Sequence, residues 1–439
     1  MSNNKKNALP KIGFVSLGCP KNQVDTEVML KELVDAGYEI VAEDIDADII
    51  IVNTCAFITS AKQESIDNIL DVAWLKKNRH LKAIIVAGCL AERYRGQVME
   101  EMPEVDALIG VGSIHKIKEC VESVWEKKKY TSFEPVDACP LGGERVVTTP
   151  EYTAYLKIAE GCDSRCTYCA IPSIRGPFRS RPMEDVVAEA KSLGELGAKE
   201  LILVAQDTTR YGLDLYGGYK LDELIRRITE ETKIPWIRLL YCYPDKITDG
   251  LIDQLKNNGR LLKYIDIPIQ HINADILRRM NRHGGADAVR DAVRRLREVP
   301  GITLRTTAIV GFPGETEEQF EELCDYVRET EFDRFGAFAY SREEGTPAYD
   351  FPDQVDEQTK QDRLDKIMSI QMDISEKLNG KKVGRTLKVL CEGWDPVAER
   401  NYGRSEADAP EIDGKVYFTA KKRPAEGEFV DVKIEEAMD

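Results

Sequence analysis

Three cysteines lie close together in the sequence with the spacing C-x-x-x-C-x-x-C, at Cys162, Cys166 and Cys169. They directly follow a predicted strand at residues 155–159. Three thiolates on one short loop can hold three corners of a cubane iron–sulfur cluster and leave the fourth iron open to a small molecule. A structural zinc site would need a fourth ligand nearby, and none is evident in the loop. A zinc site and unrelated thiols are the alternatives to a [4Fe–4S] cluster.

Three further cysteines, Cys19, Cys55 and Cys89, each come at the end of an apolar run. The intervals are 36 residues from Cys19 to Cys55 and 34 from Cys55 to Cys89, about one β/α unit each. Successive units place equivalent positions at one edge of a parallel sheet, so we expect the three thiols to converge there. Gly18 and Gly88 would allow close backbone approach beside them. The pattern predicts a second cluster with one open iron; buried structural cysteines are the alternative.

The chain has eleven cysteines, and the other five have no mutual spacing. An odd number of cysteines in a reducing compartment does not indicate a disulfide framework. We interpret the five as structural or incidental, although one of them, Cys242, follows a predicted strand. They are Cys120, Cys139, Cys242, Cys324 and Cys391.

Residues 1–140 alternate apolar strands with helical stretches. Strands are predicted at 11–17, 47–52 and 81–87, and helices at 22–36 and 59–77. Strands that are apolar throughout and alternate with helices are typical of a parallel sheet that is covered on both faces. Proline and glycine residues then mark a linker at about 133–149.

Residues 150–379 also alternate, and they predict a partial (β/α)6 barrel, whose active site would lie at the carboxyl ends of the strands. A charged helix at 358–378 leads out of it. The expected barrel strands are 155–159, 201–205, 237–241, 264–267, 304–310 and 335–340, with helices such as 183–194, 221–232 and 286–299 between them.

Residues 380–439 have short strands at 386–391, 414–419 and 428–434, separated by glycine and proline, which indicates a small β-barrel. The expected fold class is therefore α/β, with an N-terminal parallel-sheet domain, a central partial (β/α)6 barrel and a C-terminal small β-barrel.

The 439-residue chain carries a net charge of −16, from 77 acidic and 61 basic residues. No apolar run approaches the ~18–20 residues that span a membrane. The first eleven residues are polar and basic without an apolar core, so they do not resemble a secretory signal. We therefore expect a cytoplasmic protein. A phosphate backbone usually binds to a basic patch, whereas an acidic surface suits a basic partner, so nucleic acid is not expected to be required.

With an aromatic residue, Tyr168, directly before the third cysteine, the loop resembles that of the radical S-adenosylmethionine (SAM) superfamily. The resemblance implies that the open iron binds the amino and carboxylate groups of SAM. One electron from a reductant then cleaves the sulfonium and yields a 5′-deoxyadenosyl radical, which the barrel shields from water.

The order of the three domains resembles the methylthiotransferases over nearly the whole chain. The resemblance implies an auxiliary [4Fe–4S] cluster at Cys19, Cys55 and Cys89 in addition to the radical cluster on the loop. It also implies two molecules of SAM per product, and a TRAM-like domain at 380–439 for substrate recognition. One branch of this family acts on transfer-RNA adenosines, and the other on an aspartate of the twelfth protein of the small ribosomal subunit.

Four segments resemble the ribosomal-protein branch. Residues 16–22 (Ser-Leu-Gly-Cys-Pro-Lys-Asn) differ from the Gln-Met-Asn that typically follows the cysteine in the RNA branch. Residues 168–176 differ from its Val-Pro-Tyr-Thr-Arg-Gly run, and residues 266–271 and 280–282 also resemble the ribosomal-protein branch. The leading hypothesis is methylthiolation of an aspartate β-carbon in this basic protein. The alternatives are a transfer-RNA adenosine methylthiotransferase, and an iron–sulfur scaffold or electron-transfer protein, which would not cleave SAM.

Four residues are candidates for binding the cofactor: Tyr168, Gln206, Asp207 and Gly311. Gln206 and Asp207 end the second barrel strand, and Gly311 follows the strand at 304–310, which the resemblance puts beside the adenosyl group.

Other polar residues have ordinary structural explanations. Thr316 and Gln319 fit a helix capping box. His271 ends a strand and could be structural or functional. The arginines after the cysteine loop could face an anion, but a solvated basic loop is the expected case; they are Arg175, Arg179 and Arg181.

Overall fold

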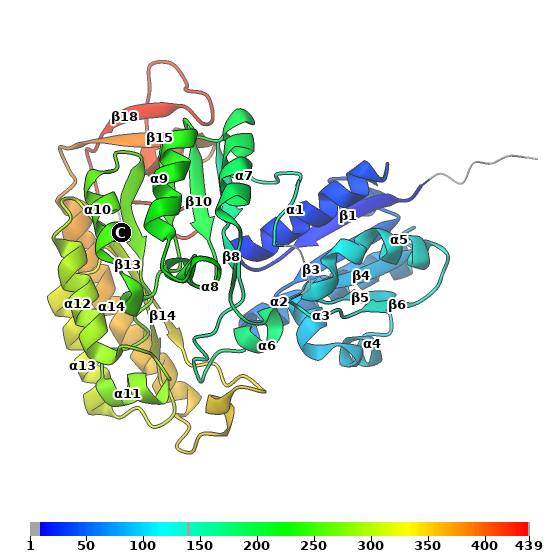
Figure 1. Cartoon of the computed structure of the whole chain (residues 1–439), viewed down its shortest axis with the longest axis horizontal. Coiled ribbons are helices and arrows are strands. Elements are labelled where there is room, and N and C mark those ends of the chain that lie inside the picture. Colours follow the sequence, from blue (N-terminus) through cyan, green and yellow to red (C-terminus); the bar gives the residue numbers. More distant parts are fainter. Residues whose placement is uncertain (1–8, 138–140, 438–439) are drawn as a thin grey trace, which may run out of the picture.

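The computed structural model describes residues 9–137 and 141–437 (Figure 1). A parallel sheet with its helices comes first, a larger parallel sheet follows, and a small antiparallel sheet ends the chain. The predicted α/β fold class with these three parts is confirmed. Among the described helices, none combines the length and the apolar character needed to cross a membrane.

The N-terminal sheet has six parallel strands in the order β2-β1-β3-β4-β5-β6, where the sequence predicted three. The three additional strands have only two or three residues each, too few to give a hydrophobic pattern. The strands are β1 (Lys11–Ser16), β2 (Glu39–Ile40), β3 (Ile49–Thr54), β4 (Ala83–Gly88), β5 (Ala107–Ile109) and β6 (Tyr130–Ser132).

Helices cover both faces of this sheet, which explains why every residue of β3 and β4 is buried and these strands are apolar almost throughout. On one face lie α1 (Pro20–Asp35) and α5 (Ile117–Trp125), and on the other lie α2 (Thr59–Asn78), α3 (Cys89–Tyr94) and α4 (Gly96–Glu101). Two short 3₁₀ helices, η1 (Asp44–Asp46) and η2 (Val111–Lys116), complete the part.

The central sheet has six parallel strands in the order β14-β13-β12-β11-β10-β7, so that neighbours in sequence are neighbours in space. Strands β7 and β14 form its two edges, as a partial barrel requires. The strands are β7 (Thr153–Lys157), β10 (Glu200–Val204), β11 (Trp236–Leu239), β12 (Leu261–Asp266), β13 (Thr303–Val310) and β14 (Arg334–Ala339).

The helices between these strands turn one apolar face to the sheet; in α9, for example, Leu221, Leu224, Ile225 and Ile228 are buried at helical spacing. The predicted capping box of Thr316 and Gln319 is present at the start of α13. The long helices are α7 (Met183–Glu195), α9 (Leu221–Glu231), α10 (Asp249–Asn257), α12 (Gly285–Arg297), α13 (Glu317–Thr330) and α14 (Glu357–Gly380).

Shorter elements decorate the barrel, several of them at the carboxyl ends of its strands. They are α6 (Ile171–Arg175), α8 (Leu213–Tyr216), α11 (Ala274–Arg279), η3 (Thr208–Arg210), η4 (Pro244–Lys246), η5 (Pro347–Asp350) and the two-stranded pair β8 (Ala159–Glu160) and β9 (Arg179–Ser180).

The C-terminal sheet is antiparallel, with the order β17-β16-β15-β18 and a bulge between Cys391 and Gly393. Its strands are β15 (Thr386–Asp395), β16 (Arg400–Ser405), β17 (Val416–Phe418) and β18 (Phe429–Lys433). Strand β16 was not predicted, because its residues are almost all polar. The sheet packs on the barrel through Trp236 and Phe429, whose ring centroids lie 4.8 Å apart in an edge contact.

Candidate active site

Cys19, Cys55 and Cys89 follow β1, β3 and β4, three neighbouring parallel strands, and therefore lie at one edge of the N-terminal sheet. Two glycines let the backbone approach them. Gly18 has φ +87°, and a Cβ there would lie 2.8 Å from the Cβ and 3.1 Å from the Sγ of Cys55. Gly88 also has φ +87°, and its Cβ would lie 2.2 Å from Asn53 Oδ1. The close approach that the sequence predicted here is confirmed.

Two of these thiols, those of Cys55 and Cys89, are buried, and a cation lies in the same environment. Burial raises the pKa of Cys55, and the neighbouring Cys19 adds to the rise. Burial also raises the pKa of Cys89 to about 12, although the Arg175 guanidinium beside it acts in the opposite direction. The backbone of Cys55 is fixed by Ser65, whose hydroxyl accepts from its N–H at 3.0 Å and donates to its carbonyl at 2.9 Å.

The second cysteine loop begins in a tight backbone contact. Gly161 has φ +78°, and a Cβ there would lie 2.0 Å from the carbonyl oxygen of Pro177. The N–H of Cys162 donates to the carbonyl of Gly176 at 3.1 Å, and the N–H of Cys169 donates to that of Cys166 at 3.0 Å. The loop is thus folded on itself and clamped at its base.

The segment at 280–282, which was singled out in the sequence, holds this loop from the other side. The N–H of Thr167 donates to the carbonyl of Met280 at 3.0 Å, and Asn281 Nδ2 donates to that of Arg165 at 2.9 Å. Arg282 Nη1 lies 3.9 Å from Cys166 Sγ, and its guanidinium stacks over the ring of Tyr243 at 4.2 Å.

Burial also raises the pKa of Cys162 and Cys169. Both cysteine sets therefore combine buried thiols with a buried arginine. Within residues 9–137 and 141–437, no three histidine, cysteine or acidic side chains are arranged to hold a single metal ion.

A buried ionic network connects the two cysteine sets. Arg175, at the end of α6, donates from Nη2 to Cys89 Sγ at 3.3 Å and to Asn22 Oδ1 at 2.9 Å. Its Nη1 donates to Asp25 Oδ2 at 2.5 Å and to Glu160 Oε2 at 3.2 Å. Lys157 joins the same two carboxylates, at 2.5 Å and 3.0 Å.

The expectation of a solvated basic loop was wrong for Arg175 and Arg181, which are only 2% and 4% exposed. Arg181 pairs with Glu189 at 2.7 Å, and Arg179 donates to the carbonyls of Val136 and Asp137. Three of the four side chains that Arg175 contacts, those of Asn22, Asp25 and Cys89, lie 86 to 153 residues away in the chain, so local sequence carried no signal for them.

Lys21 is a second residue that sequence reasoning missed. It is 6% exposed, and its Nζ lies 3.3 Å above the centroid of the Tyr241 ring. Burial opposes its charge, but Tyr241 and Cys19 raise its pKa above the ordinary value. The pair brings the start of α1 against the carboxyl end of β11, so it joins the N-terminal cysteine edge to the barrel mouth.

Of the four cofactor candidates, Gln206 has a buried polar atom without a hydrogen-bond partner among the described residues. Its Nε2 donates to Glu160 Oε1 at 2.5 Å, while its buried Oε1 has no partner among the described residues. Tyr168 packs, half-buried, against a cluster that contains Phe312, the residue after Gly311. Gly311 has φ +70°, and a Cβ there would meet Lys360.

Asp207 has partners for both carboxylate oxygens. Oδ1 accepts from Thr209 at 2.6 Å and from the N–H of Arg210 at 3.2 Å, and Oδ2 accepts from Lys246 at 2.9 Å. His271 is fully buried, and its Nδ1 accepts from the N–H of Asn273 at 2.9 Å. These contacts agree with the structural alternative for this residue.

The structural interpretation of the remaining cysteines agrees with their burial. Four lie in hydrophobic cores: Cys120, Cys242, Cys324 and Cys391. Cys139 lies outside the described residues.

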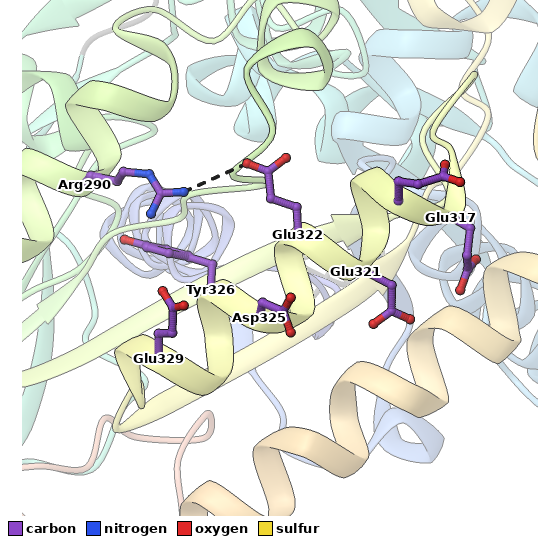
Figure 2. Close-up of a pocket in the computed structure, with 8 residues that line it drawn as sticks. Arg290, Glu317, Glu321, Glu322, Asp325, Tyr326 and Glu329 are labelled. Carbon is purple, nitrogen blue, oxygen red and sulfur yellow. Dashed lines mark ion pairs between the residues drawn. The ribbon is translucent and has the colours of Figure 1, made fainter.

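A surface hollow of about 470 Å³ lies over α13, and none of the six candidate ligand cysteines lines it (Figure 2). Six acidic residues line it together with Tyr326 and Arg290, and Arg290 forms an ion pair with Glu322 at 3.9 Å. Because no cysteine contributes to its wall, the hollow is separate from the candidate active site.

Three family models match the chain. Residues 11–110 match the uncharacterized protein family UPF0004, residues 156–327 the radical SAM superfamily, and residues 383–439 the TRAM domain.

Curated relatives are similar over nearly the whole length. The chain is 50% identical over 437 residues to the ribosomal protein uS12 methylthiotransferase RimO of Desulforamulus reducens, which covers 98% of each chain. It is 51% identical over 427 residues to the enzyme of the same name from Pelotomaculum thermopropionicum, which covers 97% of this chain and 96% of the relative. The enzyme of the same name from Geobacter sulfurreducens is 49% identical over 437 residues, which covers 99% and 98%.

Solved structures support the fold alone. The radical SAM methyltransferase TsrM from Kitasatospora setae superposes with a TM-score of 0.60 at 15% identity, over 77% of this chain and 73% of that one. The cobalamin-dependent radical enzyme OxsB superposes with a TM-score of 0.52 at 16% identity, over 84% and 56%.

Proposed function

The chain belongs to the family of the ribosomal protein uS12 methylthiotransferases, which are radical SAM enzymes, and we propose that it methylthiolates the β-carbon of an aspartate in uS12. The observation that carries this proposal is the 50% identity to a uS12 methylthiotransferase over 98% of both chains. The alternative of an iron–sulfur scaffold would not account for this similarity.

We propose that the six cysteines hold two [4Fe–4S] clusters: Cys162, Cys166 and Cys169 the radical cluster, and Cys19, Cys55 and Cys89 the auxiliary one. The donor set supports this, since each site offers three thiols and one buried arginine that offsets thiolate charge. Three thiolates leave one iron of each cluster without a protein ligand. When bound, the clusters and SAM supply the electron transfer, the radical and the methylthio group.

The protein's own residues hold and shield these groups. We expect Gln206 Oε1, buried and without a partner among the described residues, to accept a hydrogen bond from SAM. We propose Tyr168 and Gly311 as further contacts to SAM, because Tyr168 packs against the apolar cluster that contains Phe312, the residue after Gly311. Asp207, whose oxygens are occupied, would act by fixing η3 beside Gln206.

The chain parts would divide the work. We propose that residues 1–140 carry the auxiliary cluster, 150–379 the radical chemistry, and 380–439 substrate recognition. The basic substrate suits a chain with a net charge of −16. The proposal also includes a one-electron reductant and a cytoplasmic location, and it requires no nucleic acid.

The test is an assay of the anaerobically reconstituted chain with dithionite, SAM and a uS12 peptide, in which the peptide and 5′-deoxyadenosine are quantified by mass spectrometry and chromatography. We expect a methylthio adduct on the peptide with aspartate and none on the same peptide with asparagine. Transfer RNA serves as the competing substrate. Methylthiolated adenosine as the only product would contradict the proposal.

A further inference from the structure

Each cysteine set lies against one buried arginine, but the two arginines differ in origin. Arg282 and Cys166 both belong to the central part of the chain, and their Nη1 and Sγ atoms are 3.9 Å apart. Arg175 also belongs to the central part, yet its Nη2 reaches Cys89 Sγ at 3.3 Å in the N-terminal part. Arg175 thus extends from the central part of the chain and contacts a sulfur of the N-terminal cysteine set.

The Arg175 guanidinium is held in one orientation by oxygen acceptors on both of its terminal nitrogens. Nη1 donates to Asp25 and Glu160, and Nη2 donates to Asn22 as well as to Cys89. Ala170 and Ile174 fix its helix, because both are buried in the hydrophobic core that contains α3. The Nη2–H of Arg175 that donates to Cys89 Sγ is therefore held in place by the protein's own contacts.

We propose that Arg175 is a positioning residue that raises the reduction potential of the auxiliary cluster through Cys89 and ties that sulfur to the radical loop. This rests on the ligand assignment under the proposed function. A cation and an N–H···S contact at a ligating sulfur stabilise the reduced, more negative cluster. The tie runs through Glu160, which also accepts from the N–H of Gly161 at 3.2 Å, one residue before Cys162.

The test starts from a parent in which Cys162, Cys166 and Cys169 are all replaced by Ala, so that only the auxiliary cluster remains. Arg175→Met, Arg175→Lys and Arg282→Met are then made in this parent. Arg282→Met is the matched control, since it removes a buried arginine from the other cysteine set. Iron content and the midpoint potential, from an anaerobic titration followed by electron paramagnetic resonance, are measured for each.

We expect the parent to hold about four irons, as one cubane cluster does. Arg175→Met should lower its midpoint potential, Arg175→Lys should lower it less, and Arg282→Met should leave it unchanged. If Arg175→Met fails to hold the cluster, Arg175→Lys decides, because it keeps the charge but loses the forked geometry.

Three results would overturn the inference. Arg175 variants that hold the cluster at the parent's potential would exclude a contact that tunes it. An equal fall in Arg282→Met would mean that any buried cation has the effect. A parent without a cluster would contradict both the ligand assignment and this inference. A parent with about four irons, whose potential is unchanged in the Arg175 variants, would contradict only the inference.

Discussion

Replacing Glu200 by Gln should loosen the C-terminal sheet from the barrel. Glu200, in β10, is fully buried and accepts from Arg238 Nε at 2.7 Å and from Arg404 Nη2 at 2.6 Å. Arg404 lies in β16, so this carboxylate joins the two sheets. The amide of Gln keeps one acceptor but no charge, so the buried Arg238 guanidinium loses its carboxylate partner and Arg404 keeps only Glu392.

The expected loss of stability follows from the burial of this ion pair. Breaking a buried ion pair by removing one partner costs about 3–5 kcal/mol, because the remaining charge stays desolvated. A matched control is Glu392→Gln on the same Arg404 guanidinium, at 2.6 Å but with a partly exposed carboxylate. Losing that hydrogen bond should cost only about 1–2 kcal/mol.

Hydrogen exchange measures the loss of stability locally, at individual amides. It is preferred because the global unfolding of a multidomain chain would not be two-state. We expect the opening free energy of amides in β15 and β16 to fall by about 3–5 kcal/mol, or to the limit set by their own stability, in Glu200→Gln. Amides of β3 and β4 should not change. Unchanged protection in β15 and β16, or an equal loss in β3 and β4, would refute the reasoning.

Three further predictions concern the cysteines, the C-terminal part and pH. Each single Ala variant of Cys19, Cys55 and Cys89 should still form 5′-deoxyadenosine under dithionite but give no methylthiolated peptide. Each Ala variant of the loop cysteines should form neither product. If a variant of Cys19, Cys55 or Cys89 modified the peptide at the wild-type rate, the auxiliary site would not be the one that delivers the sulfur. Removal of residues 380–439 should weaken peptide modification while SAM cleavage persists, and loss of cleavage with both clusters intact would give this part another role. Burial opposes the charge of Glu200, but Arg238 and Arg404 outweigh it and lower its pKa. Its stabilisation is therefore fully present above the ordinary carboxyl pKa and is lost as the pH falls from there through the lowered pKa of the folded state. Thermal scans between about pH 5 and about pH 2 should show a smaller loss of stability in Glu200→Gln than in the wild type.

The sequence was sufficient for features that depend on local pattern. The strand before Cys55 is apolar because both of its faces are covered, and that pattern alone put the cysteine at a strand end. The similar intervals between Cys19, Cys55 and Cys89, 36 and 34 residues, then predicted a common edge, since each interval is about one β/α unit. The cluster proposed for the loop at 162–169 rests on the spacing of its three cysteines.

The sequence was not sufficient for contacts made between parts of the chain. Arg175 was expected in solvent, because nothing near it in sequence reveals that Asp25 lies 150 residues away and 2.5 Å from its Nη1. The contact of Lys21 with Tyr241 depends in the same way on how the two sheets dock. Short strands such as β5 escaped prediction for a different reason, since three residues cannot establish a period.

The two cysteine sets are docked by charge as well as by the apolar packing of Ala170 and Ile174 on the core that contains α3. Arg175 and Lys157 face Asp25 and Glu160, so two positive and two negative groups share one buried site. Such a network adds little net stability, because desolvation offsets its attraction. It does, however, penalise every displaced arrangement, in which a buried charge would lose its partner. Under the proposed function, the methylthio group passes from the auxiliary site to a carbon radical formed at the loop site, which would require one fixed separation between the two sites. A directional ionic network specifies such a separation better than an apolar surface that can slide.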